Sequence, residues 1–285
     1  MTATTTTGSE LVRSPGPAER DPVATGRQRT RRELALGIAI PVAILLLWQV
    51  AAYGDWIDRR IYPAPDRIVA TGIDLAKSGA LWDAFSLTAY RVLFGWFLGV
   101  VAGIGVGVVM GSSRWVRKAL EPTLDALYVV PKLALLPVFI NLFGLDEGPK
   151  IALVSVTVFF FVWISTMTAV MAVPVGYHDT GRVFGAGRWR MFRHVTGPAI
   201  LPQVFVALRV AAGVAVLVIV AAEFIVGTTG LGYLIFNSRS LLLNDRMYVG
   251  IVVVALFGVV FAEIVRRIGN WVMPWAPGDA HPTGQ

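Results

Sequence analysis

The chain contains six apolar stretches, each long enough to cross a lipid bilayer. At ~1.5 Å per residue, about 20 helical residues cover a hydrocarbon core of ~30 Å. The stretches that we expect to be spans are 34–53, 92–111, 126–143, 151–173, 204–226 and 247–265. Hydrophobic residues make up 55% of the chain and charged residues 15%, which is outside the range of soluble globular domains. The sequence therefore predicts an all-α, polytopic membrane protein with six transmembrane helices.

Charged residues lie inside the third and fifth spans, and the sixth span ends with Glu263. Pro131, Lys132 and Pro137 interrupt the third span, so we expect its helix to be kinked or to begin late. Arg209 and Glu223 lie in the fifth span, ~21 Å apart along a helix, which is too far for the two to pair with each other. We expect Arg209 at the cytoplasmic edge and Glu223 paired with a residue on another helix.

The segments outside the spans define the domain organisation. Residues 1–33 are rich in Thr, Pro, Gly and Arg, so we expect a disordered tail that buries too little apolar surface to fold alone. The run at 34–53 is longer than a signal-peptide core and follows a long polar leader, so we interpret it as a retained anchor helix. A five-helix core at 83–267, which includes a loop at 174–203, and a second tail at 268–285 complete the chain.

Positive charges are distributed unequally between the two sides that six crossings define. Fifteen Lys and Arg residues fall on the side of the N-terminal tail, and seven fall on the other side. Cytoplasmic loops collect Lys and Arg, so we expect both termini in the cytoplasm and the protein in a bacterial inner membrane. The net charge of +7 is scattered along membrane borders, which argues for lipid and against nucleic acid as a partner.

Glycine recurs at every fourth position of the second span. The row consists of Gly95, Gly99, Gly103, Gly107 and Gly111. In lipid, small residues at this spacing let two helix backbones approach closely and gain dispersion contacts. The row serves packing within the chain or a contact between subunits, and we favour packing within the chain.

Motifs of catalysis and of metal binding are missing from the sequence. It has no Gly-Lys-Ser/Thr phosphate loop, no His-Glu-x-x-His and no Gly-x-Ser-x-Gly. Without cysteine there is no disulfide and no thiolate metal site, and His178, His194 and His281 have no ligand-like spacing. The glycines at 227–232 lack the strand and helix of a dinucleotide fingerprint, so we interpret them as a turn outside the membrane. We therefore expect no enzymatic activity, no cofactor and no metal.

The longest cytoplasmic loop, 174–203, has an ordered aromatic and basic pattern. It predicts two short helices separated at the glycines of 185–187. The apolar face available on them consists of Val183, Phe184, Trp189, Phe192 and Val195. Such a face fits a groove on another protein, and it equally fits an interfacial helix on anionic headgroups. The composition of the loop favours neither interpretation.

The same loop resembles the EAA loop of permease subunits of ATP-binding-cassette importers. The family pattern is Glu-Ala-Ala, three residues, Gly-Ala, five residues, Phe, two residues, Val, two residues, Pro, three residues and Pro. At these spacings the chain carries Asp179, Gly185, Ala186, Phe192, Val195, Pro198 and Pro202. The chain departs from the pattern where Thr180 and Gly181 replace the two alanines.

Further segments from Ile61 onward are similar to one branch of these permeases, the branch for aliphatic sulfonates, taurine and nitrate. They are residues 62–65, 130–137, 143–147, 222–223 and 230–234. The resemblance implies the type I fold and import of a small organic anion such as a sulfonate, taurine or nitrate. It also implies the partners: separate cytoplasmic ATPase subunits that hydrolyse ATP, an external solute-binding protein, and a second permease copy in a homodimer.

The resemblance also implies where the ATPase is coupled. The implied coupling residues are Asp179, Phe184, Gly185, Ala186, Phe192, Val195, Pro198 and Pro202. The alternative function is a secondary transporter or channel that works without an ATPase, but the inverted repeats and ion relays typical of such carriers are not found.

Polar groups inside the third span are candidates for the translocation path. Pro131 and Pro137 free backbone carbonyls, which are tolerated at membrane depth only beside protein or water. Lys132 and Asn141 lie in the same stretch, where polar side chains are expensive and tend to be functional. The alternative for Lys132 is that its side chain extends to the membrane interface.

Overall fold

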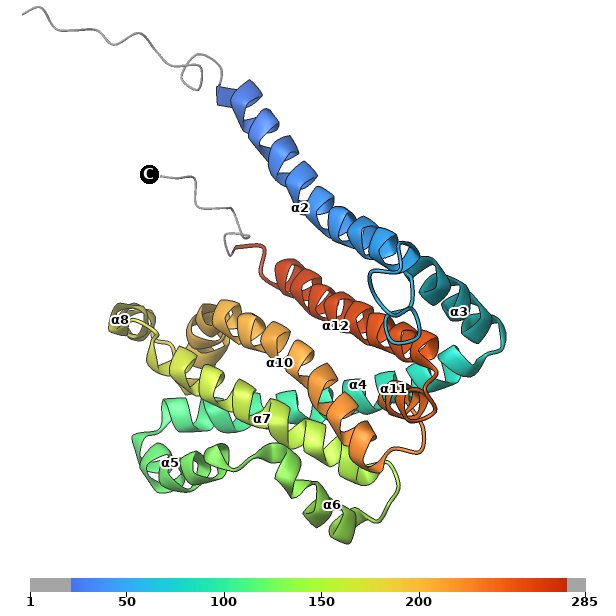
Figure 1. Ribbon diagram of the computed structural model, residues 1–285. Helices are drawn as coiled ribbons and strands as arrows, with labels where there is room; N and C mark the ends of the chain where they lie inside the picture. The colour runs from blue at the N-terminus through green and yellow to red at the C-terminus, as the bar shows by residue number, and fades with distance from the viewer. Residues whose placement is uncertain (1–21, 276–285) are drawn as a thin grey trace, which may run out of the picture. The chain divides into compact units, whose positions relative to one another are not determined.

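The computed structural model describes residues 22–275, and every regular element in this range is a helix (Figure 1). The helices are α2 (Pro22–Tyr53), α3 (Pro65–Lys77), α4 (Ala80–Ser112), α5 (Arg114–Val129), η1 (Lys132–Leu135), α6 (Leu136–Phe143), α7 (Gly148–Met171), α8 (Val175–Val183), α9 (Arg188–Met191), η2 (Phe192–Thr196), α10 (Gly197–Val226), α11 (Leu231–Ser240) and α12 (Asn244–Val272). The all-α prediction is confirmed.

The chain divides into two units, Met1–Asp66 and Arg67–Gln285. In the first unit, α2 begins at Pro22, so the tail expected to be disordered up to residue 33 overlaps this helix. Proline suits the first position of a helix, because its fixed φ is helical and its missing N–H would have no partner there. Residues 1–21, and 276–285 of the C-terminal tail, lie outside the described residues.

Four helices within residues 22–275 are long and apolar enough to cross a membrane. They are α4, α7, the continuous helix Arg188–Val226 and α12. The bent pair Arg114–Val129 and Lys132–Phe143 makes a fifth span when its halves are counted together, and α2 contributes a shorter apolar segment, Ala39–Tyr53. The six expected spans therefore correspond to four unbroken helices, one broken pair and one shorter apolar helix.

The third expected span is broken instead of merely kinked. Its halves meet at 92°, so 126–143 is not one helix. Pro131 forces the preceding residue out of the helical region, and Val130 has φ −61° and ψ 127°. The Lys132 ammonium then donates hydrogen bonds to the last carbonyls of α5, those of Leu127 at 3.1 Å and Tyr128 at 2.5 Å. The lysine thus satisfies a helix end that the proline created.

The core of the second unit is formed by α4, α7, α10 and α12, which pack side by side (Figure 1). All five glycines of the row on α4 face α7. A Cβ atom at Gly99 would lie 2.8 Å from Cβ of Val158, and one at Gly103 would lie 3.0 Å from the carbonyl oxygen of Phe159. No side chain fits between these two backbones, so the row is used for packing within the chain.

Candidate functional site

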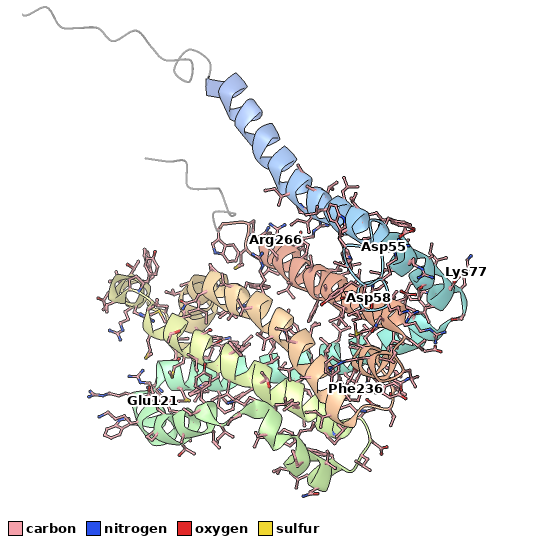
Figure 2. The ribbon with its side chains drawn as sticks, viewed as in Figure 1. Asp55, Asp58, Lys77, Glu121, Phe236 and Arg266 are labelled. Atoms are coloured by element: carbon pink, nitrogen blue, oxygen red, sulfur yellow. The ribbon has the colours of Figure 1, made fainter. Side chains whose placement is uncertain are left out.

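Two groups of polar and aromatic side chains lie at opposite ends of one long helix. The helices α9, η2 and α10 are continuous over 39 residues, Arg188–Val226, which corresponds to ~58 Å at ~1.5 Å per residue. We call this continuous helix the rod. In Figure 1, α8 lies near the start of the rod and α11 near its end. Figure 2 labels Phe236 on α11 and Glu121 on α5, which lie toward opposite ends of α7 in this view.

Loop 174–203 contains the two helical pieces that the sequence predicted, α8 and α9, but the second piece is the beginning of the rod instead of a separate short helix. After α8 the chain turns at Gly185, whose φ of +67° is in the left-handed region. The N–H of Ala186 donates to the carbonyl of Gly181 at 2.9 Å, and the N–H of Gly185 donates to that of Arg182 at 2.9 Å. These two bonds make a Schellman motif, which satisfies the C-terminal carbonyls of α8.

The expected apolar face of this segment is unevenly exposed. Val183, Phe184 and Trp189 are 84%, 82% and 70% exposed, whereas Phe192 and Val195 are half-buried. The Trp189 and Phe192 rings contact each other with centroids 6.1 Å apart. Large apolar side chains with this exposure are typical of an interaction surface.

A groove of about 750 Å³ lies beside α8 and the start of the rod. Of the implied coupling residues, the groove is lined by Phe184, Ala186, Val195 and Pro198. The other coupling residues lie around it: Asp179 on α8, Gly185 in the turn, Phe192 in η2 and Pro202 in α10. Tyr177 and Trp275 also line the groove. Trp275 was missed because nothing in its local sequence indicates that it meets a loop so distant along the chain.

Gly181, one of the departures from the family pattern, has a packing role. It is buried, and a Cβ atom there would lie 2.7 Å from Cε of Met191 and 3.6 Å from Cγ2 of Val195. The glycine therefore lets α8 pack closely on α9 and η2.

Replacing Gly185 with alanine is expected to loosen this turn. The left-handed conformation costs a residue with a Cβ atom about 1 kcal/mol, while the space around Gly185 is open, so strain is the main effect. Limited trypsin digestion should cleave faster at the neighbouring arginines, Arg182 and Arg188. Gly187→Ala is the matched control, because that glycine also has open space but a φ of −70°. Equal cleavage of the two variants would contradict the expectation.

At the other end of the rod lies a buried ionic cluster, which we define as Arg91, Glu147, Glu223 and Thr229. Arg91 and Glu223 are 0% and 1% exposed. The Arg91 guanidinium donates to the carboxylates of Glu147 and Glu223, and to the carbonyl and hydroxyl of Thr229 at 2.9 and 2.8 Å. Each of its five N–H groups therefore has an acceptor. The expectation that Glu223 pairs across helices is confirmed.

The loop between α10 and α11 closes around this cluster. The backbone N–H of Gly232 donates a hydrogen bond to the Glu223 carboxylate at 2.8 Å. The backbone N–H of Leu231 donates to the Thr88 hydroxyl at 2.8 Å. The Thr88 hydroxyl in turn donates to the Glu223 carboxylate at 2.9 Å. Gly230 has φ +104°, and a Cβ atom there would collide with both Arg91 and Glu223. The glycines expected to form a simple turn thus allow the backbone to reach a buried charge.

Glu147 is the exposed arm of the cluster. Glu147 is the residue directly before α7, and its side chain is 39% exposed. The Lys150 ammonium lies 3.5 Å from one of its carboxylate oxygens. Hydrogen bonds from Arg91 lower the pKa of the Glu147 carboxyl below its usual value. Together with Lys150, the cluster has two cations and two anions and is neutral, which is the condition for holding charges away from water.

Arg91 was missed as the centre of this cluster, although a signal existed. Thr88, Arg91 and Gly95 are spaced i, i+3 and i+7, so they share the helix face that carries the glycine row. An arginine on the packing face of an apolar helix, with a glutamate in another span, indicates a buried pair.

The four residues expected on the translocation path are not gathered into one site by this chain alone. Pro131 and Lys132 lie at the break between α5 and α6, where the ammonium is bonded to carbonyls and lies 4.5 Å from the Phe160 ring centroid. Pro137 is in the first turn of α6, and Asn141 is exposed farther along the same helix. Their role in a path stays a prediction.

Comparison with known families identifies one match that covers most of the chain. Residues 99–274 match the family described as "Binding-protein-dependent transport system inner membrane component". This range contains α8, all of the rod and every residue that lines the groove except Trp275.

Individual proteins are similar over still longer ranges. The putative aliphatic sulfonates transport permease protein SsuC of Escherichia coli (strain K12) is 34% identical over 84% of this chain and 90% of its own length. The taurine transport system permease protein TauC of the same organism is 29% identical over 86% and 90%. The crystal structure of a bacterial ABC transporter involved in alginate import superposes with a TM-score of 0.60, at 17% identity, over 90% of this chain and 97% of that one. This last match shows a shared fold.

Proposed function

Because the chain belongs to the family of binding-protein-dependent transport system inner membrane components, we propose that it imports a small sulfonate-type anion as one of two identical permease subunits. The chain is a multi-pass inner-membrane permease of an ABC importer, and ATP is hydrolysed on a separate subunit. Permeases of this kind work with an ATPase and a solute-binding protein. The sulfonate and taurine permeases similar to this chain support the substrate class.

The observation that carries this proposal is the exposed Phe184 beside the groove. Phe184 is 82% exposed although it is a large apolar side chain, and it sits on a turn that the Schellman bonds hold in place. A preformed aromatic projection costs little conformational entropy when a partner covers it. The partner that we propose is the cytoplasmic ATPase, which contacts the coupling residues Asp179–Val195. With this contact on the cytoplasmic side, both chain termini lie in the cytoplasm.

The movement that follows from this contact is a shift between two populated states. Binding of ATP by the ATPase pair must favour one arrangement of the permease by differential contacts at α8 and η2. The rod starts at this contact and continues through the core, so a displacement at Phe192 reaches α10 without an intervening loop. The broken span, with Lys132 and Asn141, supplies the proposed path.

Replacing Phe184 with glutamate is expected to abolish ATP-driven uptake by weakening the binding of the ATPase. Loss of an aromatic anchor should reduce co-purification of the ATPase by about tenfold or more. The assay is uptake of labelled taurine or an alkanesulfonate by proteoliposomes that contain the full importer. Val175→Glu is the control, because Val175 is also exposed, at 71%, but does not line the groove.

Three results would contradict parts of this proposal. Uptake that persists without ATP would favour the secondary-carrier alternative. Unchanged capture of the ATPase by the Phe184→Glu variant would remove the coupling surface from α8. Uptake of nitrate with no uptake of sulfonates would leave the permease assignment intact and correct the substrate class.

A further inference from the structure

We infer that Arg91 ties the broken span to the rod, so that the α6 end of this span moves together with α4 and α10 during transport. This inference rests on the proposed function, because it concerns how movement spreads beyond α8. In this role Arg91 is a positioning residue, which acts through the elements it connects. The inference starts from a buried cation whose contacts reach several separate segments.

The contacts of Arg91 join elements that are far apart in the sequence. On one side the guanidinium binds Glu223 in the last turn of the rod and Thr229 in the loop that follows. On the other side it binds both carboxylate oxygens of Glu147. Glu147 lies four residues after the end of α6, in the short connection to α7. A single side chain on α4 therefore bridges the end of the rod and the short connection between the broken span and α7.

The strength of this bridge follows from its geometry and its burial. The bond pattern to Glu147 is bidentate, which fixes orientation as well as distance. Arg91 is 0% exposed, so salt and water screen its bonds far less than those of a surface pair. The two carboxylates cannot approach or separate freely while both are bonded to one planar group.

The Glu147 side of the bridge is the side that we expect to tolerate substitution, because its carboxylate reaches water. Glu223 has no access to water, so loss of its partner would leave a buried charge. Glu147 is 39% exposed, and water can replace part of its bonding. Glu147→Gln keeps the size and an acceptor oxygen while it removes the charge. Asp146→Asn is the matched control, because Asp146 is the exposed carboxylate next to it.

The test uses the complete importer in proteoliposomes and measures solute transported per ATP hydrolysed. Glu147→Gln is expected to lower this ratio by about fivefold or more, at the lower end of typical coupling between distant sites. ATPase capture at α8 and the rate of ATP hydrolysis should persist. Asp146→Asn should keep the ratio of the unmodified protein.

A distance measurement separates this role from a merely structural one. The chain has no cysteine, so spin labels would react only with introduced cysteines. The two that we propose are Ser86→Cys on α4 and Leu142→Cys on α6. Both positions are exposed. The distance between the labels is expected to be narrow and equal with and without ATP, and to become broad in the Glu147→Gln background.

Two results would overturn the inference. One is a Glu147→Gln variant with an unchanged transport ratio and an unchanged distance. The other is an equal fall in transport and ATP hydrolysis, since that would show a loss of active protein without uncoupling. Neither result touches the proposed function, which is tested separately by capture of the ATPase at α8, by the ATP requirement of uptake and by the substrate taken up.

Discussion

Replacing Arg91 with leucine is expected to reduce the free energy of unfolding by about 3–5 kcal/mol, because it leaves the carboxylate of Glu223 buried without its cation. Glu223 is 1% exposed, so water cannot replace the lost bonds, and the Thr229 carbonyl and hydroxyl lose their donor as well. The measurement is thermal unfolding of the purified protein in detergent, together with the yield of monodisperse protein.

Two further variants test whether the loss of stability in Arg91→Leu comes from the uncompensated charge of Glu223. Arg209→Leu is the control, because it removes the same side chain from an exposed position on α10 and should change stability little. The double variant Arg91→Leu with Glu223→Leu should recover part of the loss, since it removes the uncompensated charge. An Arg91→Leu protein as stable as the unmodified one would show that the cluster contributes nothing to the fold.

Replacing Gly99 with alanine is expected to be the most damaging single-methyl change on α4. The new Cβ atom would lie 2.5 Å from the carbonyl oxygen of Ser155 and 2.8 Å from Cβ of Val158, so α4 and α7 would have to separate. Overpacking of a close-packed contact costs about 1–3 kcal/mol, and in lipid no hydrophobic driving force restores the contact. The measurement is the melting temperature in detergent and the folded yield in membranes.

Gly105→Ala is the matched control for this change. Gly105 lies in the same helix, is exposed, and has nothing within 4 Å of the position that a Cβ atom would occupy. Because alanine favours helix more than glycine, this variant should be neutral or slightly more stable. Similar losses at the two positions would mean that close contact with α7 does not explain the effect of Gly99→Ala.

The helical class and the main spans follow from the sequence because they depend on local composition. An uncharged apolar run has to be helical in lipid, and this held for α4 and α7. The interruption near Pro131 was expected as a kink or a late helix start, whereas the structure has two helices that meet at 92°, with Lys132 bonded to carbonyls of α5. The spacing of the two prolines marks where the helix is interrupted, but it does not specify the angle between the two halves.

The two functional groups differ in how far the sequence reveals them. The α8 segment follows a spaced pattern within one loop, so its glycine turn and exposed Phe184 could be expected. The cluster at Arg91 draws on segments 56 and 132 residues away, and no periodicity within one helix can report such a pairing. The signals in the sequence were the position of Arg91 on the packing face of α4 and the unlike charge of Glu223 in another span.

The five-residue π-turn η2, at Phe192–Thr196, has a geometric consequence for the proposed coupling surface. Each residue of an α-helix turns the chain by about 100°, and a π-turn contains one residue more than the α-helical turn it replaces. That extra residue rotates α9 and the chain before it about the helix axis, relative to the buried side of α10. The direction in which α9 and the turn before it project thus depends on η2 as well as on the turn at Gly185, while the residues that pack α10 into the core can remain as they are.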